Sequence, residues 1–481
     1  MMAGLKPYPA MKNSEVPWLG AVPAHWEVRS LGSLATSISL RGRPDLPLLS
    51  VVREKGVIAR TLTGDDANHN FIPDDLSNYK VVRAGNLVIN KMKAWQGSLG
   101  IAPMDGIVSP AYFVFDLAID DRHFGQALLR SKAYVSFFAR ASDGVRIGQW
   151  DLSIDGMKRI PVVLPSKSEQ TAIVRFLDHA DRRIRRAIRA KQQLIALLGE
   201  QKQALIHRAV TRGLDPDVRL KPSGVEWLGD VPWHWGATRL KHVAHIQTGI
   251  TLGKTYAKVE LIDRPYLRVA NVQAGHLKLS NVARVQVPRA EVARSTLQPG
   301  DVLMTEGGDI DKLGRGCVWY GEIDECLHQN HVFAVRPSAA ELLPEFLVAL
   351  MASSHGRSYF QLTAKQTTNL AATNSTTLGN FPLLLPCVGE QRKILEWLGE
   401  HGVPLDEAAS RANREILLLR EYRTRLIADV VTGKLDVREA AARLPDAIEP
   451  ADAALDDEAL AEDDENAAEA ADESDTEAVA A

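Results

Sequence analysis

One nine-residue segment occurs twice in this chain of 481 residues. Residues 18–26 read WLGAVPAHW and residues 227–235 read WLGDVPWHW, so the Trp, Leu, Gly, Val, Pro, His and Trp positions agree. Segments of this length rarely agree so closely by chance, and similarity at a fixed spacing is the signature of an internal repeat. The sequence therefore predicts two copies of one structural unit, which limits the possible folds more than any other feature.

A second pair of segments repeats with no change in length. Residues 159–178 match residues 380–399 at an offset of 221, and the same offset relates LIHRAVTRGLD at 205–215 to LIADVVTGKLD at 426–436. A constant offset means that no insertion or deletion was accepted there, whereas residues 31–147 match the second half only loosely. Each half is therefore predicted to contain a variable body followed by a segment of constrained length.

The constrained segment has the pattern of a long helix in both copies. Apolar residues recur at alternating spacings of four and three, which is typical of a coiled-coil seam. At about 1.5 Å per residue, a helix from Glu169 to Thr211 would be on the order of 60 Å long and would act as a spacer. Pro404 predicts a break, with a short first piece and a longer second one. The expected seam and partner-facing residues are Ile173, Leu177, Ile184, Leu194, Leu198 and Leu205, followed in the second copy by Leu405, Ile416, Leu419 and Leu426.

The bodies predict a fold of the α+β class. Both mix short β-like runs with brief helical stretches and many Gly, Pro and Asn turns. The second long helix starts at the far body, so packing against the first would make an antiparallel coiled coil with a pseudo-two-fold axis. The predicted boundaries are 1–165 for the first body, 166–213 for its helix, 214–386 for the second body, 387–436 for its helix and 437–481 for an acidic disordered tail.

The charge of the chain is unevenly distributed. The formal net charge is -3, but residues 446–481 hold 15 Asp and Glu with no Lys or Arg, and such a segment is expected to be disordered. The remainder holds 57 basic against 45 acidic residues, a formal charge of +12. This excess fits a nucleic-acid partner without requiring one.

The sequence also predicts the compartment. No apolar run approaches the roughly 20 residues that span a bilayer, and the first residues lack the apolar core of a signal peptide. We therefore expect a cytoplasmic protein with no membrane partner. Cys317, Cys326 and Cys387 are odd in number without a Cys-x-x-Cys pair, so buried thiols are expected rather than disulfides or a zinc ribbon. His328 and His331 lack a third ligand nearby in the sequence, which favours structural histidines over a metal site.

Candidate contacts for a nucleic-acid partner lie in polar segments that also contain Trp or Gln. Base reading requires bidentate Arg, Lys, Gln or Asn at groove edges, and phosphate binding requires cations and hydroxyls. Residues 144–149 and 363–370 precede the constrained segment at the same place in both halves, which strengthens both; solvated loops are the alternative. The candidates are Lys91, Lys93, Gln96, Arg146 and Gln149 in the first body, Lys365, Gln366, Thr367, Thr368 and Asn369 in the second, and, more weakly, Lys254.

Other repeated residues have structural interpretations. The four tryptophans of the nine-residue segments are expected to anchor the cores rather than to stack on bases. Glu-Gln pairs at 169–170 and 390–391 resemble helix-capping residues, and Ser166 with Glu169 fits a capping box. The basic run at 182–191 predicts either a solvated helix face or a surface for a partner or a DNA backbone.

Taken together, these motifs resemble one known family. The order of body, helix, body and helix, the WLG-x-VP-x-HW segments, and VLPSKSEQ and LLPCVGEQ ahead of the LIHRAVTRGLD and LIADVVTGKLD segments resemble the specificity subunit of type I restriction-modification enzymes over residues 14–436. The resemblance implies that each body is a target recognition domain reading one half of a split, asymmetric site in double-stranded DNA. It also implies that the helices set the spacing and bind two methyltransferase subunits, which a motor-nuclease subunit joins.

The resemblance implies that this chain is not itself an enzyme and binds no cofactor, with S-adenosylmethionine, ATP and Mg expected on the partner subunits. The sequence agrees in having no Asn-Pro-Pro-Tyr type methylase motif, helicase loop or nuclease carboxylate-lysine set. Two alternatives stay open. The chain could be a coiled-coil scaffold without a DNA role, or a single-chain DNA-modifying enzyme without a recognisable motif.

Overall fold

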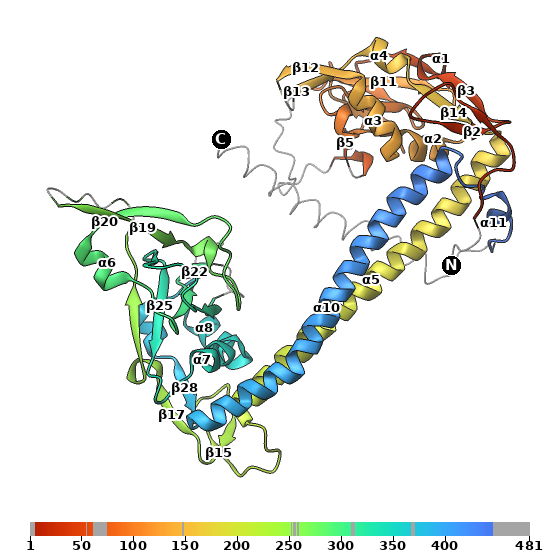
Figure 1. Ribbon diagram of the computed structural model, residues 1–481. Helices are drawn as coiled ribbons and strands as arrows, with labels where there is room; N and C mark the ends of the chain where they lie inside the picture. Colours follow the sequence, from red (N-terminus) through yellow and green to blue (C-terminus); the bar gives the residue numbers. More distant parts are fainter. Residues whose placement is uncertain are drawn as a thin grey trace. The chain divides into compact units, whose positions relative to one another are not determined.

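The computed structural model describes residues 5–53, 55–60, 75–146, 149–251, 253, 256, 259–308, 313–366 and 371–445. It divides into two compact units, of which the first draws on residues 1–191 and 414–481 and the second on residues 192–413. Each unit contains a mixed α+β body and parts of two long helices, α5 (Lys167–Arg212) and α10 (Val388–Val431) (Figure 1). The α+β expectation is therefore confirmed for each body.

The described elements of the first body are mostly short strands. The helices are α1 Leu31–Leu34, η1 Ala94–Gln96, α2 Arg122–Leu129, α3 Lys132–Arg140 and α4 Ile154–Lys158. The strands are β1 Met11–Asn13, β2 Ala21–Pro23, β3 Glu27–Ser30, β4 Ala35–Ile38, β5 Leu49–Val52, β6 Gly56–Ala59, β7 Lys80–Val82, β8 Leu87–Asn90, β9 Leu99–Ile101, β10 Gly106–Val108, β11 Tyr112–Leu117, β12 Ser142–Arg146, β13 Gln149–Leu152 and β14 Pro161–Leu164.

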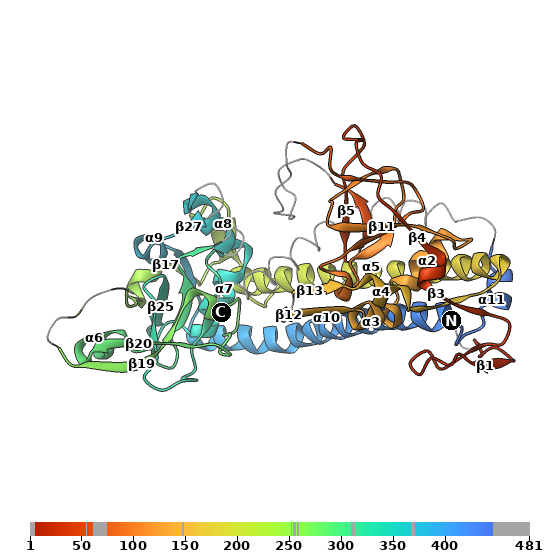
Figure 2. The same cartoon turned by 90° about the horizontal axis from the view of Figure 1, so that it is seen from above.

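A four-stranded antiparallel sheet in the order β4-β11-β8-β9 forms the centre of this body. Successive side chains of a strand point to opposite faces. Leu87 and Phe115 accordingly join the main core with α2 and α3, whereas Val88 and Val114 join a smaller core with β5 and β6. Because both faces are buried, these strands are apolar runs rather than alternating ones. Figure 2 shows the body in a second view.

The second body has a similar succession of elements. The helices are η2 Leu240–His242, η3 Val269–Asn271, α6 Arg289–Ser295, α7 Pro344–Ala352, α8 Ser354–Thr363 and α9 Ser375–Gly379. The strands are β15 Leu220–Pro222, β16 Asp230–Pro232, β17 Gly236–Arg239, β18 Ala244–Thr248, β19 Leu261–Leu267, β20 Ala283–Pro288, β21 Val302–Thr305, β22 Gly307–Gly308, β23 Gly316–Val318, β24 Leu327–His328, β25 Val332–Pro337, β26 Lys365–Gln366, β27 Ala371–Ala372 and β28 Pro382–Leu385.

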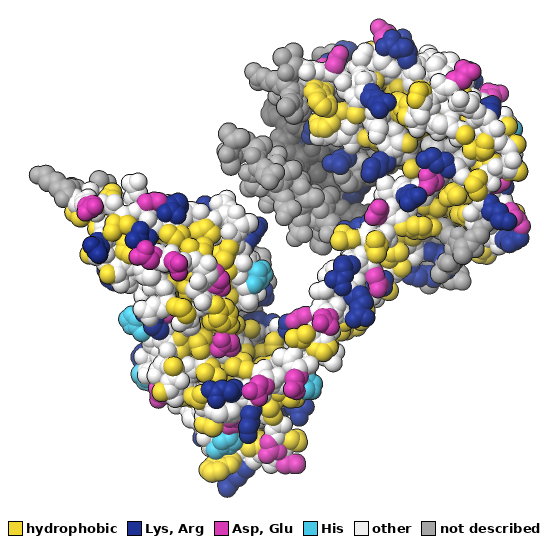
Figure 3. Space-filling view, viewed as in Figure 1, with side chains coloured by type: hydrophobic (Ala, Val, Ile, Leu, Met, Phe, Trp, Pro, Cys, Tyr) yellow, Lys and Arg dark blue, Asp and Glu magenta, His cyan; other side chains and the backbone are white. Residues whose placement is uncertain are grey.

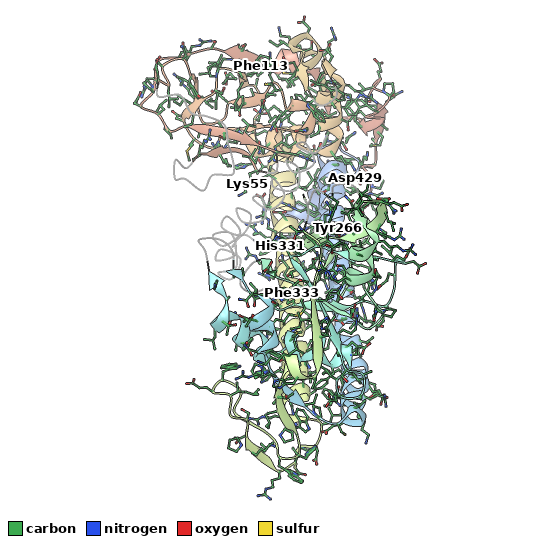
Figure 4. The ribbon with its side chains drawn as sticks, turned by 90° about the vertical axis from the view of Figure 1, so that its left-hand side faces the viewer. Lys55, Phe113, Tyr266, His331, Phe333 and Asp429 are labelled. Atoms are coloured by element: carbon green, nitrogen blue, oxygen red, sulfur yellow. The ribbon has the colours of Figure 1, made fainter. Side chains whose placement is uncertain are left out.

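Its central sheet runs β18-β25-β21-β23, the same arrangement as β4-β11-β8-β9 in the first body. Val302 and Met304 face the main core of the unit with α7 and α8, and Leu303 faces a second core. A further sheet, β20-β19-β24, includes a parallel pairing between β19 and β24. Figure 4 labels Tyr266 on β19 and Phe333 on β25, both of which are buried.

The long helices pack against each other within each unit. In the first unit, Ile173 and Leu177 of α5 share the main core with Leu426 of α10, and Asp181 pairs with Arg423. In the second, Lys202 of α5 lies 2.6 Å from the carboxylate of Asp406 in α10. The bounds of α5 extend the predicted helix by two residues at its start and one at its end.

The packed side chains do not include every predicted seam position. Ile184 and Ile416 are buried like the three residues above, whereas Leu194 is 45% exposed. The remaining predicted seam residues are half-buried, and these are Leu198, Leu205, Leu405 and Leu419. Among the predicted seam residues, the buried ones thus all belong to the first unit.

Pro404 does not break α10, so the predicted division into two pieces is wrong. Proline removes one backbone donor and crowds the preceding turn, which disfavours a helix interior. Two contacts to α5 flank the proline. The side chain of Lys202 lies beside Gly402, and its ammonium donates to Asp406 on the other side. The helix continues unbroken between these contacts.

The chain remains folded beyond α10, so the predicted start of the tail at residue 437 is wrong. Helix α11 (Arg438–Ala442) follows, and the side chains of Val437 and Ala441 are buried in the core of the first unit. Arg175 of α5 also donates to the carbonyl of Leu444 at 2.6 Å. Residues 446–481 lie outside the described residues, and their disorder stays a prediction.

Two of the three cysteines are buried as expected. Burial raises the pKa of both the Cys317 and the Cys326 thiol to about 12. Cys387 is exposed, so the expectation of a buried thiol is wrong at that position. Among the described residues, no helix combines the length and the apolar character that crossing a membrane would require.

Candidate nucleic-acid interface

The two polar segments predicted in the first body lie against each other. Strands β12 and β13 form a hairpin, and the backbone N–H of Leu152 donates to the carbonyl of Lys91 at 2.9 Å. The Lys91 ammonium lies 2.7 Å from the Asp151 carboxylate, and the rings of Trp95 and Trp150 are 5.1 Å apart. The fold thus joins residues some 60 positions apart into one surface.

The candidate contacts on this surface are not equally available. Lys91 is half-buried and partly neutralised by Asp151, and Gln96 is half-buried in η1. Lys93 is exposed. Arg146 and Gln149 face each other across the hairpin in backbone register, and their side chains lie outside the described residues. Lys93 is therefore the described candidate best placed to reach a partner.

A hairpin occupies the corresponding place in the second body. Strands β26 and β27 pair, and β22 joins them on the other side of β27. Lys365 is exposed. The other candidates of this body fall outside the described residues, either as side chains or entirely, and these are Gln366, Thr367, Thr368, Asn369 and Lys254. Their contacts stay predictions.

The residue that takes the place of Lys91 in the second body is Glu306. The backbone N–H of Thr373 donates to the carbonyl of Glu306 at 2.8 Å, which matches the bond from Leu152 to Lys91. The Glu306 carboxylate accepts from His331 at 2.5 Å, and the His331 side chain is 55% exposed. Figure 4 shows His331 beside Phe333, at the start of β25.

A hydrogen-bond donor, Lys91, therefore lies beside one hairpin, and an acceptor, Glu306, lies beside the other. Lysine can donate to guanine or phosphate, whereas a carboxylate can accept from the amino group of cytosine. Glu306 does not stand out in the sequence, because Lys91 and Glu306 are separated by 215 positions rather than the 221 of the repeated segments and the bodies match only loosely. In the sequence, His331 stands out only as a possible metal ligand. The other histidine, His328, is fully buried, as expected for a structural residue.

Glutamates at the starts of the long helices attach the bodies to them. In the first unit, Glu169 accepts from the Tyr8 hydroxyl at 2.6 Å and from His25 Nε2 at 2.8 Å. These bonds replace the predicted capping box, because the carboxylate points to the body rather than back to Ser166. The hydroxyl of Ser166 instead lies 3.2 Å from that of Ser168.

The second unit repeats this attachment with a different donor. Glu390 accepts from His234 Nε2 and from the indole N–H of Trp235, both at 3.0 Å. The neighbouring glutamines also bond alike, since Gln170 accepts from the N–H of Asp121 and Gln391 from that of Leu343. The repeated Glu-Gln pair thus positions each body on its helix, and the capping interpretation is wrong for the two glutamates.

The repeated tryptophans are mainly core residues. Trp26 and Trp235 are 0% and 1% exposed, as expected of anchors. Trp18 packs edge-on against Tyr134, with ring centroids 5.9 Å apart. Trp227 is 39% exposed, and its indole donates to His355 Nδ1 at 3.1 Å.

The basic run on α5 is partly engaged within the helices. Arg185 pairs with Asp181 at 2.8 Å, and Lys191 pairs with Glu415 of α10. Figure 3 shows Lys and Arg side chains interspersed with Asp and Glu along the visible face of the long helices. Among the residues that the structure describes, no group of three or more His, Cys, Asp or Glu could hold a metal ion.

Comparisons with known proteins find relatives of one kind. No protein-family model matches the chain. A Methanocaldococcus jannaschii protein named as a type I restriction enzyme specificity subunit is 22% identical over 207 residues, which cover 43% of this chain and 47% of that relative. The EcoKI specificity subunit of Escherichia coli K12 is 24% identical over 337 residues, or 69% of this chain and 68% of the relative. Both relatives are specificity subunits of type I restriction enzymes, and this chain is similar to them over 43% and 69% of its length.

A solved structure shares the fold of this chain. A chain from a study of complex assembly and conformational transition in a type I restriction-modification system superposes with a TM-score of 0.60. The match covers 86% of this chain and 99% of the solved one. At 17% sequence identity, it shows a shared fold and nothing more specific. This chain therefore spans less than half of the first curated relative but nearly all of the solved structure.

Proposed function

We propose that this chain is the DNA-reading subunit of a type I restriction-modification complex, in which each body reads one half of a split, asymmetric site. One observation carries the proposal. The two bodies place hairpins at corresponding positions, but Lys91 flanks one hairpin and Glu306 the other. A repeated scaffold with different polar groups at the same place is suited to read two different short sequences.

In this proposal, α5 and α10 form an antiparallel coiled coil that fixes the gap between the two halves, and the chain is an internal repeat with a pseudo-two-fold axis. The ion pairs of Asp181 with Arg423 and of Lys202 with Asp406 support antiparallel pairing, because residue numbers rise along one helix as they fall along the other. Major-groove faces recur about every 34 Å, so a stiff spacer would select the length of the unread stretch.

The helices would also bind two methyltransferase subunits, which the motor-nuclease subunit joins. This chain would bind no cofactor and catalyse no step, and the partners would hold S-adenosylmethionine, ATP and Mg. We place the complex in the cytoplasm. The uneven charge supports a polyanionic partner, since the chain without residues 446–481 carries a formal +12.

Selection from a random double-stranded DNA library tests this function. The chain, assembled with its methyltransferase subunits, should enrich two short, different sequence blocks separated by a gap of fixed length. Enrichment without sequence preference would favour a scaffold. Methylation or cleavage of DNA by the isolated chain with the usual cofactors would favour a single-chain enzyme.

A further inference from the structure

One junction has the same backbone geometry in both bodies. Strand β3 pairs antiparallel with β14, and β17 pairs with β28, so that Ser30 faces Pro161 as Arg239 faces Pro382. Directly before the second strand of each pair lie the short helices α4 and α9. The register therefore identifies corresponding residues one by one, without reliance on sequence similarity.

A lysine and a glycine have changed places between the two junctions. In the first body, Lys158 at the end of α4 covers Gly32, where an added Cβ would lie 2.7 Å from the Cβ of the lysine. In the second body, the residue corresponding to Gly32 is Lys241, and the one corresponding to Lys158 is Gly379. An added Cβ on Gly379 would lie 3.4 Å from the Cβ of Lys241. In both bodies the side chain of a lysine thus packs over a glycine. The lysine comes from the segment before β14 in the first body and from the segment after β17 in the second.

An arginine differs in position between the two bodies in the same way as the lysine. Arg159 follows α4 in the first body and corresponds to Asn380, whereas Ser30 on β3 corresponds to Arg239 on β17. In the second body, Asn380 Oδ1 accepts from Arg239 at 3.3 Å and from Lys241 at 3.0 Å. Among the exchanged positions, each junction therefore carries one Lys and one Arg, although different segments of the chain supply them.

The charges at these junctions are not balanced within the fold. Lys158, Arg159, Arg239 and Lys241 are exposed, and none of them forms an ion pair with another described residue. The oxygen of Asn380 gathers two cations in the second body without neutralising either. Like charges brought together repel, and an anion at this place would relieve that repulsion.

The second junction also contains a concave surface beside its cations. Lys241 and Asn380 line an open depression of about 350 Å³ together with the hydroxyl-bearing Ser375 and Thr376 and with His245. Lysine, arginine and hydroxyl side chains are the groups that contact the sugar-phosphate backbone of DNA. Packing alone explains why a lysine stem covers a glycine, but it does not explain why an arginine accompanies the lysine in both exchanges.

From these exchanges we infer that each junction binds backbone phosphates of duplex DNA, through Lys158 and Arg159 in the first body and Arg239 and Lys241 in the second. The inference rests on the proposed DNA-reading function and assigns these residues to affinity rather than base choice. Phosphate contacts position a protein on the duplex and carry no direct sequence information. The positive charge of one Lys and one Arg is thus present at both junctions, although the sequences of the segments that form them differ.

Charge-removing variants test this site in the assembled complex. Lys158→Met and Lys241→Met keep an apolar stem over the glycine and remove only the charge. Affinity for a mixed-sequence duplex would be measured over a series of salt concentrations. Each variant should bind about eightfold more weakly at 0.1 M monovalent salt, with a logarithmic salt slope shallower by about 0.9, as for one lost phosphate contact. Lys132→Met and Lys278→Met, exposed lysines outside the two junctions, serve as controls.

A reciprocal exchange separates the charge from the position of its side chain. Lys241→Gly should weaken binding, and the double variant Lys241→Gly with Gly379→Lys should restore it, because it copies the arrangement of the first body. The nearest other atom to a Cβ on Gly379 is in Ile246, at an ordinary 3.5 Å, so the double variant should fold.

The outcomes distinguish this site from the function on which it rests. If the unsubstituted complex has no salt-dependent affinity for duplex DNA, the proposed function fails. If that complex binds but the two methionine variants match it in affinity and slope, the phosphate site is refuted and the function stands. Loss of methyltransferase assembly in these variants, with unchanged DNA affinity of whatever complex remains, would also refute the site and assign the cations to a protein contact.

Discussion

Glu390 accepts a hydrogen bond from the indole N–H of Trp235 at 3.0 Å. The tryptophan ends the second nine-residue segment, and the glutamate lies in the first turn of α10. In the first unit, Glu169 uses the Tyr8 hydroxyl instead, and the buried Nε1 of Trp26 has no hydrogen-bond partner among the described residues. The repeated segments thus hold each body to a long helix, which explains why they recur while the rest of the bodies diverge.

Removing the first of these carboxylates should destabilise the chain. Glu169→Ala would leave the buried Tyr8 hydroxyl and the His25 imidazole without their acceptor. Lost partners of buried polar groups cost about 1–3 kcal/mol of unfolding free energy. Denaturant unfolding of the full chain measures the effect, with the exposed Glu27→Ala as the control. Equal stability of the two variants would contradict this role.

Stability should fall in mild acid because of His355. This residue is 1% exposed, accepts from Trp227 at Nδ1 and lies 2.7 Å from the Pro382 carbonyl at Nε2, so only the neutral ring satisfies both partners. Burial lowers its pKa below the usual histidine value. The unfolded chain then binds the proton more readily than the folded one, so stability is lost as pH falls through about 6.5.

Thermal unfolding near neutral pH and in mild acid measures this dependence. His355→Gln can keep a donor and an acceptor but cannot titrate in this range, so its melting temperature should fall less on acidification than that of the unsubstituted chain. A fall of the same size in both proteins would show that other groups cause the acid sensitivity.

The three cysteines should differ in reactivity. The thiolate is the reactive form, and burial raises the pKa of the Cys317 and Cys326 thiols to about 12, whereas Cys387 is exposed. A thiol-specific reagent should therefore label Cys387 first in the folded chain, as measured by mass spectrometry of digests. Cys387→Ser should abolish the fast phase. Fast labelling that persists in this variant would mean that the second body opens readily.

The residues beside the hairpins should affect base choice in only one half of the site. Glu306→Gln replaces an acceptor by a group that also donates, and each lost base contact costs about 1–3 kcal/mol of discrimination. We expect a changed preference in the half read by the second body and none in the other half. Lys93→Met should affect only the first half. Sequencing of DNA selected by the variant complexes checks both, and a change spread over both halves would contradict separate reading.

The sequence predicted the long helices well because their constraint is local and periodic. The α5 bounds follow from the heptad pattern, and the constant offset of 221 located both helices. Pro404 misled the prediction, because α10 continues through it beside Lys202 of α5, a contact that no single segment reveals.

The candidate site was harder to predict because its residues are joined by tertiary pairing. Lys91 and Asp151 meet only once β12 and β13 fold back on the sheet. In the sequence, Lys158 opposite Gly379 and Gly32 opposite Lys241 look like two unrelated mismatches. Strand register shows that the same pair of positions changed in opposite directions.

Mapping of methylated positions in the genome of a cell that carries this chain and its methyltransferase partner tests the central claim most directly. The account predicts one asymmetric motif made of two different short blocks separated by a gap of constant length. A single uninterrupted motif, or two identical half-sites, would contradict the claim that two different bodies read two halves of one DNA target.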